Sequence, residues 1–208
     1  MARRRLTLDL DPIVAGATAG PEPDDAATAM LDAAEALLRE HGLHRWSVDD
    51  VAERAGLGRT SVYRRFPSKD DLVHGVLARE LRVTIAAIGA VVTRSPTVED
   101  AVVDAALAGL RALDGSVVDR LLHTDPADVL PFLTTDAGPL VAQARAAFVG
   151  PLVGLGVVPD PAHAEIAAEA LARLGLSFVV TRETVLPLDD LRALRTSVAA
   201  LVLPLLRR

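Results

Sequence analysis

The sequence predicts an all-α protein in which a small N-terminal three-helix unit with a helix-turn-helix is joined to a larger C-terminal helical domain. Alanine and leucine dominate the apolar half of the 208 residues, and both favour helix. Apolar residues recur at helical spacing along most of the chain. Glycines, prolines and capping residues divide this pattern into segments of helical length. The expected division is a flexible tail over 1–23, the helix-turn-helix unit over 24–72 and the second domain over 73–208.

The tail is expected because three prolines interrupt residues 1–23 and no apolar periodicity is sustained there. The three arginines at positions 3–5 suit a minor groove, where basic arms of DNA-binding proteins lie. Asp9 and Asp11 dilute this charge, so a solvated start without an assigned role is the favoured interpretation. The first helix is expected over 24–41, with one apolar stripe that Gly42 ends.

A helix-turn-helix is expected over residues 47–66. Ser47 is suited to cap the first helix, and the two acids that follow it suit the positive N-terminal end. Gly56 comes directly after the last apolar position, where a left-handed backbone is cheap only for glycine. The second helix is expected over 59–66, and Pro67 ends it. Two short helices joined by a turn that contains glycine form this motif.

The second helix of this motif carries the groups that suit DNA. Residues 57–69 contain four basic side chains and no acid, interleaved with hydroxyl groups. Guanidinium groups and hydroxyls on an exposed helix match phosphate oxygens and base edges in a major groove. The residues predicted to contact DNA are Ser47, Arg59, Thr60, Ser61, Tyr63, Arg64, Arg65 and Lys69.

The same stretch resembles the DNA-binding segment of TetR-family transcriptional regulators. The family usually has a stronger capping residue at the position of Gly58 and often histidine at the position of Arg65. The resemblance implies that Tyr63 and Lys69, the only lysine in the chain, contact phosphates. The resemblance is specific over roughly residues 25–75, and beyond them it extends only to the helical architecture. The matching residues are Ser47, Val51, Ala52, Ala55, Gly56, Leu57, Ser61, Val62, Tyr63, Phe66, Ser68, Lys69 and Leu72.

The rest of the chain predicts one long helix over 69–94, which links the two parts, and then a series of further helices. Ser68 is expected to cap the long helix, and Ser95 and Pro96 mark its end. Breaks between 114 and 139 separate short helical pieces. The further helices are expected over 97–113, 115–124, 126–133, 140–155, 160–181 and 188–206.

The resemblance implies that the second domain forms a homodimer and holds a small-molecule effector. Two amphipathic C-terminal helices suit a four-helix interface between two copies, and ordinary intrachain core is the alternative. The predicted dimer residues are Ile166, Ala170, Leu174, Phe178, Leu194, Val198, Leu201 and Leu205. The effector is expected to be apolar or amphipathic and to lie within residues 97–180. The predicted ligand residues are Leu107, Leu110, His123, Phe132, Gln143, Arg145, Phe148 and Arg173.

Composition excludes several other classes of protein. The chain has no cysteine, so it has no disulfide and no thiolate ligand or nucleophile. No long apolar run and no clear signal peptide occur, which predicts a cytoplasmic protein. The net charge of −6 means that DNA binding depends on local positive charge. No catalytic or phosphate-binding motif is present, and the paired aspartates open helices, so no enzyme and no cofactor is expected.

No metal site is expected either, because the five histidines are dispersed and Gly42 separates His41 from His44. The resulting prediction is a DNA-binding transcriptional regulator, a ligand-responsive repressor that binds a palindromic operator as a dimer. The alternative is a helical small-molecule sensor or adaptor whose helix-turn-helix binds protein. Basic side chains along the second helix of the motif favour DNA.

Overall fold

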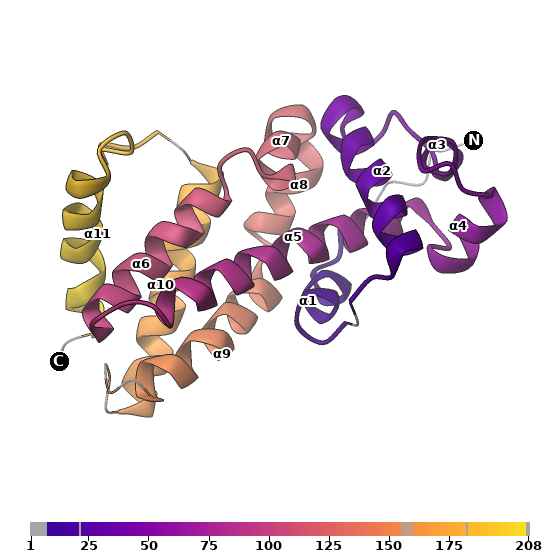
Figure 1. The fold of residues 1–208 in the computed structure, drawn as a ribbon. Coiled ribbons are helices and arrows are strands. Elements are labelled where there is room, and N and C mark those ends of the chain that lie inside the picture. The colour runs from indigo at the N-terminus through magenta and orange to yellow at the C-terminus, as the bar shows by residue number, and fades with distance from the viewer. Residues whose placement is uncertain are drawn as a thin grey trace. The chain divides into compact units, whose positions relative to one another are not determined.

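The computed structural model describes residues 8–20, 22–154, 156, 158, 160–181 and 183–206, and within them every regular element is a helix, as predicted (Figure 1). The chain packs as two compact units, and helix α5 contributes to both. The helices are α1 (Leu10–Thr18), α2 (Asp25–His41), α3 (Val48–Arg54), α4 (Arg59–Arg65), α5 (Lys69–Val92), α6 (Val98–Ala112), α7 (Val117–Thr124), α8 (Pro126–Leu133), α9 (Gly138–Gly154), α10 (Pro161–Val180) and α11 (Leu191–Leu206).

The helix boundaries from α2 to α11 lie within a few residues of the predicted ones, because local capping signals set most of them. Thr97, Ser116 and Asp160 each accept a hydrogen bond from a backbone amide in the first turn of the helix that follows. These side chains satisfy N–H groups that have no partner inside the helix. The short pieces α7 and α8 are divided at Asp125, which ends one helix and begins the next.

The first unit consists of the described residues up to Arg82 together with Gly115–Asp136. Its core contains leucine and valine side chains from α2, α3, α4, α5 and α7 that are essentially inaccessible to solvent. Helix α2 packs against both α3 and α7. The fully buried members of this core include Leu38, Leu43, Val51, Val62, Leu72, Val76 and Leu121.

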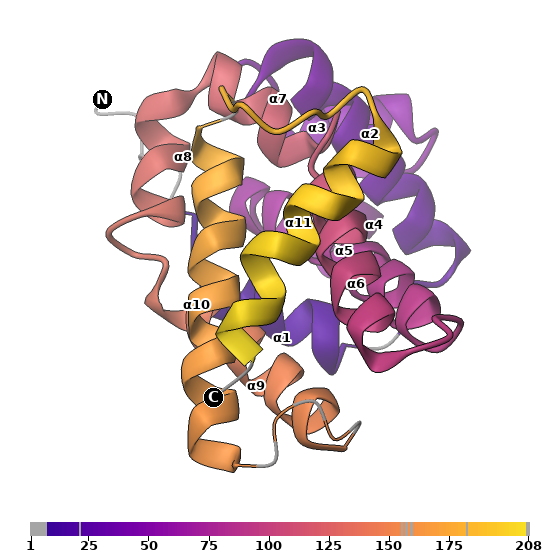
Figure 2. The ribbon, with the colours of Figure 1, turned by 90° about the vertical axis from the view of Figure 1, so that its left-hand side faces the viewer.

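The second unit consists of Val83–Asp114 and the described residues from Ala137 onward. Helix α9 packs along α10, and α6 packs along α11. Figure 2 shows α10 and α11 side by side, with the α10–α11 contact on the face turned to the viewer. One apolar cluster joins Val103 and Leu107 of α6 to small residues of α10 and to the buried face of α11.

The expectation of a tail without regular structure is wrong for α1. Asp9 caps this helix by accepting from the amide of Asp11, and Leu10, Ile13, Val14 and Ala17 are buried at helical spacing. The guanidinium of Arg82 donates to backbone carbonyls at the C-terminal end of α1. The arginines at 3–5 lie outside the described residues.

The compact units also differ from the expected division at residue 72. The part of α5 up to Arg82 belongs to the first unit, and so do α7 and α8. Contacts between α2 and α7 bring this later segment to the helix-turn-helix unit. Among the described residues, no helix combines the length and the apolar character that crossing a membrane requires.

Candidate nucleic-acid interface and ligand-binding region

The helix-turn-helix begins with the predicted cap. The backbone amide of Ser47 donates to Asp50 Oδ2 at 2.7 Å, and the amide of Asp50 donates to Ser47 Oγ at 3.3 Å. This reciprocal pair is a capping box, which satisfies two amides at the helix start. The hydrogen bonds from Ser47 lower the pKa of Asp50. Gly56 has φ of +65°, so the predicted left-handed residue at the turn is confirmed.

Helix α4 exposes its polar residues to solvent and is anchored in the core of the first unit by one buried side chain. Val62 is fully buried, whereas the side chains around it are exposed. Gly58 precedes the helix and provides no side-chain cap, as its lack of a side chain requires. The exposed predicted residues are Arg59, Thr60, Tyr63, Arg64 and Arg65, and Ser61 is half-buried.

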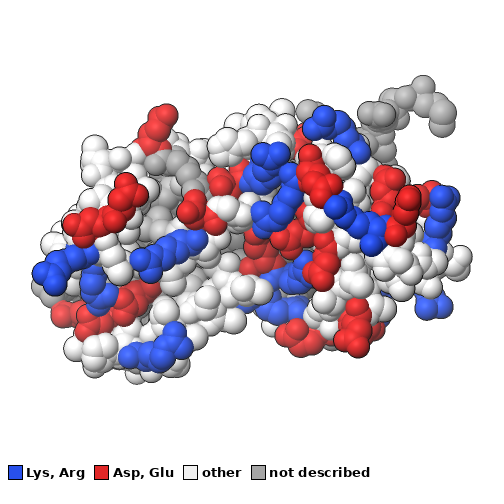
Figure 3. Space-filling view, turned by 45° about the horizontal axis from the view of Figure 1, so that its top comes forward, with Lys and Arg blue, Asp and Glu red and all other residues white. Residues whose placement is uncertain are grey.

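The basic side chains of α4 are held differently from one another. Arg59 Nη1 lies 2.7 Å from Asp49 Oδ2, and Arg65 Nη1 lies 3.0 Å from Asp24 Oδ2. Arg64 makes no ion pair with any described residue. Acidic and basic side chains are interspersed over the face drawn in Figure 3, so positive charge is local rather than general. This distribution agrees with a chain that is acidic overall, in which residues 57–69 carry a local excess of positive charge.

Lys69 lies against the residue that leads into the helix-turn-helix. Its Nζ donates to the carbonyl oxygen of Trp46 at 2.6 Å and lies 4.1 Å from the centre of the Trp46 ring. The indole of Trp46 is buried and donates from Nε1 to the carbonyl of Gly42 at 2.8 Å. Lys69 therefore joins the start of α5 to the segment before α3. Its contact with phosphate stays a prediction.

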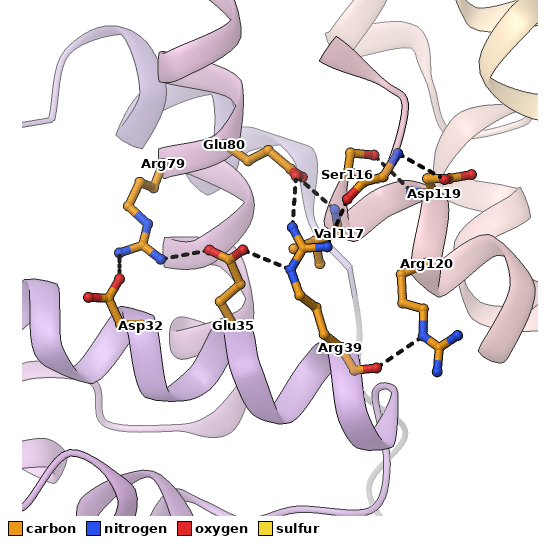
Figure 4. A network of polar contacts seen from close by, with 10 residues as sticks. Asp32, Glu35, Arg39, Arg79, Glu80, Ser116, Val117, Asp119 and Arg120 are labelled. Atoms are coloured by element: carbon orange, nitrogen blue, oxygen red, sulfur yellow. Dashed lines mark hydrogen bonds and ion pairs between the residues drawn. The ribbon is translucent and has the colours of Figure 1, made fainter. Parts of the chain in front are cut away.

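A polar network, which sequence reasoning missed, joins α2, α5 and α7 (Figure 4). Arg79 of α5 reaches Asp32 at 2.6 Å and Glu35 at 2.8 Å. Glu35 also pairs with Arg39 at 2.8 Å, and Arg39 lies 4.0 Å from Glu80. These contacts link the first helix of the DNA-binding unit to the long helix. Alternating acids and bases on α2 and α5 were the available sequence signal, but their pairing depends on the fold.

Glu80 forms the centre of this network because it reaches α7. Its Oε1 accepts from the amide of Val117 at 2.7 Å, and Arg120 of α7 donates to the carbonyl of Arg39 at 3.0 Å. Burial raises the pKa of Glu80, while the hydrogen bond from Val117 and the charge of Arg39 act in the opposite direction. A carboxylate at a helix N-terminus satisfies free amides there.

The residues predicted to bind an effector do not converge on one site. Leu107, Leu110 and Phe148 belong to the apolar cluster of the second unit or pack against it. Arg145 and Arg173 both pair with Glu169, at 3.0 and 2.8 Å. Two residues lie in the first unit, where His123 is exposed and Phe132 is buried, and Gln143 is exposed on α9.

An open groove of about 300 Å³ lies within the second unit. Its polar wall contains Arg195, which pairs with Asp100 and Asp104, and Ser95, whose Oγ donates to Asp104 at 2.8 Å. Of the predicted ligand residues, Leu107 lines it. The lining consists of Val91, Arg94, Ser95, Pro96, Asp104, Leu107, Ala108, Arg111, Leu191 and Arg195.

The residues predicted to form a dimer fall into three groups by their exposure to solvent. Ile166 is 69% exposed, Leu174 40% and Leu201 49%. Ala170, Phe178 and Leu205 are half-buried. Leu194 and Val198 are buried in the apolar cluster of their own chain. The intrachain alternative therefore describes these last two residues.

Comparison with known proteins finds two family matches, one in the N-terminal part of the chain and one in the C-terminal part. Residues 30–76 match the family model of bacterial regulatory proteins of the tetR family. Residues 97–204, about half of the chain, match the C-terminal domain of the bacterial tetracycline repressor. The first match contains the helix-turn-helix, and the second contains α10, most of α11 and the part of the groove lining from Asp104 onward.

Individual relatives are similar over different shares of the chain. The transcriptional regulator AlkX of Mycobacterium tuberculosis is 27% identical over 157 residues, which is 73% of this chain and 73% of AlkX. The regulator EthR of the same organism is 44% identical over 62 residues, which is 30% of this chain and 29% of EthR. The crystal structure of the TetR-family repressor AlkX from Dietzia matches with a TM-score of 0.64 and 26% identity, covering 90% of this chain and 98% of that one. The fold, the helix-turn-helix and both family matches agree, and the chain belongs to the TetR family of DNA-binding transcriptional regulators.

Proposed function

We propose that this regulator is a ligand-responsive repressor that binds a palindromic operator as a homodimer in the cytoplasm. The observation that carries the proposal is the exposed polar face of α4, which presents guanidinium and hydroxyl donors around one buried anchor. Such a helix suits a major groove, where Arg pairs with guanine and Tyr reaches phosphate. Its relatives are named as transcriptional regulators, so catalysis forms no part of the proposal.

Arg64 is the residue best placed to read a base. It is exposed and has no ion pair with a described residue, whereas Arg59 and Arg65 each pair with an acid. Tyr63 lies beside it and is suited to a phosphate. The resemblance to the family assigns phosphate contact to Tyr63 and Lys69, and the basic helix supplies the local positive charge that an acidic chain needs.

Selection of bound sequences from a random DNA pool tests this proposal. A palindromic winner is expected, because a two-fold dimer places two recognition helices on two half-sites. The double replacement Tyr63→Ala with Arg64→Ala should abolish binding to the winner and leave the fold intact. Arg192→Ala is the control, since it removes an exposed positive charge from α11. If the double variant binds the winner as tightly as the control does, α4 is not the recognition helix.

The effector is proposed to be an amphipathic anion that binds the groove of the second unit. Val91, Leu107 and Leu191 supply apolar surface, and Arg94 and Arg111 make no ion pair with a described residue. The Dietzia AlkX relative is described as a repressor implicated in biodegradation of n-alkanes, which suits a ligand with an apolar chain. Occupancy is proposed to shift the end of α5, and because α5 contributes to both units, ligand and operator oppose one another.

Dodecanoate and dodecanol are suitable probes, because they share a chain and differ in charge. Dodecanoate should weaken binding to the selected operator, and dodecanol should have less effect. The double variant Arg94→Ala with Arg111→Ala should remove this difference, whereas Arg192→Ala should preserve it. Unchanged operator affinity at saturating dodecanoate excludes this ligand class. An alternative role as an adaptor that binds protein requires a folded dimer that enriches no sequence from the pool.

A further inference from the structure

We propose that His44, Asp125 and Asp128 form a binding site for a first-row divalent cation such as zinc. His44 lies between α2 and α3, and the two acids lie at the start of α8. One ligand atom from each residue can be chosen so that all three lie within 4.8 Å of one another. The residues belong to the first unit, outside α4 and outside the groove. The proposed ligand is a cation and is distinct from the effector.

The distances between the ligand atoms suit a metal ion. His44 Nε2 lies 2.8 Å from Asp128 Oδ2 and 3.8 Å from Asp125 Oδ1. Nitrogen and oxygen ligands bind zinc at about 2.0–2.2 Å, so neighbouring ligand atoms around one ion are roughly 3.0–3.5 Å apart. The observed separations lie on both sides of this range. The shorter separation is a hydrogen bond between His44 and Asp128, and we expect an ion to replace it after small changes in side-chain torsion.

The surrounding structure orients the carboxylate of Asp125 toward His44. Its Oδ2 accepts from the amide of Leu43 at 3.0 Å and from Thr124 Oγ1 at 2.7 Å. Its other oxygen, Oδ1, faces His44 beyond hydrogen-bond distance. A side chain at Gly42 would place its Cβ 2.3 Å from Asp125 Oδ2, so glycine permits this close approach. The free oxygen is thus fixed in position and directed at the imidazole.

Charge also favours a cation at this place. The side chains of Asp125 and Asp128 are only 11% and 15% exposed, and His44 is 45% exposed. Two carboxylates that are largely shielded from solvent place negative charge beside the imidazole. A divalent ion is attracted to this charge, and the exposed imidazole gives access from solvent. A mixed set of imidazole and carboxylate ligands suits zinc and similar ions, with water completing the coordination.

Titration of the full chain with zinc, in competition with a chromophoric chelator and without DNA, tests the proposal. We expect one tight site per chain, which His44→Gln and Asp128→Asn each weaken by about tenfold or more. Both variants leave the hydrogen bonds of Asp125 in place. His123→Gln is the matched control, because His123 lies near a single acid, with Nδ1 3.8 Å from Asp119 Oδ1. This control should bind zinc as the wild type does.

Thermal unfolding gives a second measurement that keeps the variants interpretable. Zinc should raise the unfolding temperature of the wild type and of His123→Gln, and should leave that of His44→Gln unchanged, since only binding to the folded state stabilises it. The proposal is overturned if zinc binds His44→Gln and the wild type equally. It is also overturned if zinc changes the unfolding temperature of neither protein.

Discussion

Lys69 Nζ donates a 2.6 Å hydrogen bond to the carbonyl oxygen of Trp46 and lies 4.1 Å from the centre of the Trp46 ring. One ammonium group thus contacts both the backbone and the aromatic face of the same residue. Trp46 precedes the Ser47 cap of α3, and Lys69 begins α5. The pair therefore closes the helix-turn-helix by connecting its two ends.

Replacement of this lysine should lower stability even without DNA. Lys69→Met should reduce the free energy of unfolding by about 1–2 kcal/mol, because it removes a charged hydrogen bond and a cation–π contact. Lys69→Arg keeps the charge and should lose less. Urea unfolding monitored by Trp46 fluorescence measures both. An unchanged midpoint for Lys69→Met indicates that the contact contributes nothing to folding.

The two glycines of the turn should respond to serine in opposite ways. Gly58→Ser should stabilise the protein by about 0.3–0.5 kcal/mol, since Gly58 caps α4 with ordinary φ and a Cβ there meets no atom within 4 Å. Gly56→Ser should destabilise it by roughly 1 kcal/mol, because its φ of +65° is costly for other residues. Thermal unfolding of the two variants provides the comparison. Equal shifts of the same sign contradict this account.

The buried carboxyl of Glu80 should make the free energy of unfolding depend on pH in the range above the ordinary glutamate pKa of 4.5. Burial raises its folded pKa above 4.5, so the folded state binds more protons than the unfolded state in this window. Its contribution is therefore present below pH 4.5 and is lost as pH rises through the folded pKa. Glu80→Gln should become more stable relative to the wild type as pH rises through this window. Urea unfolding at several pH values measures the difference.

Other carboxyls of the chain affect stability at lower pH, so they do not obscure the difference between the wild type and Glu80→Gln. Hydrogen bonds lower the pKa of Asp50, Asp100 and Glu169. Their contribution is present above their ordinary pKa values and is lost as pH falls, and it is common to the wild type and to Glu80→Gln. A constant difference between the two proteins across the window contradicts the role given to burial.

The exposed face of α10 should be needed for the proposed dimer. Ile166→Glu should yield a folded monomer, because it places a charge at a residue that is 69% exposed within one chain and would be buried in the proposed dimer. Val185→Glu is the control, since Val185 is fully exposed and lies outside the predicted interface. Sedimentation equilibrium distinguishes the two. If Ile166→Glu remains dimeric, the dimer interface does not include this face of α10.

Local signals made most of the fold predictable. The Ser47 cap, the left-handed Gly56 and the break at Asp125 each act within a few residues of themselves, so they are readable without the fold. Helix α1 carried the same kind of signal, with Asp9 before apolar residues at helical spacing. Pro12 obscured it, although proline is tolerated in a first turn because those amides have no partner inside the helix.

The sites that depend on distant residues were not predictable in the same way. Glu80 meets Val117 across 37 positions, and His44 meets Asp128 across 84. His41 is close to His44 in sequence, whereas nothing in the sequence indicates that the acids of α8 are neighbours of His44. Leu194 and Val198 lie on the face of α11 that packs into the apolar cluster of the second unit. Amphipathic spacing alone does not say whether such a face packs within a chain or between chains.

The ion pairs of Arg59 with Asp49 and of Arg65 with Asp24 place carboxylates beside two of the arginines that are proposed to bind DNA. Any duplex must displace these internal anions before it gains the two arginines. Exposed pairs of this kind are worth only about 0.2–1 kcal/mol, so a well-fitted site overcomes them easily. Loose encounters with unrelated sequence gain little and dissociate sooner. On this proposal the protein carries its own competitor for DNA, and every duplex, matched or unrelated, meets the same small cost.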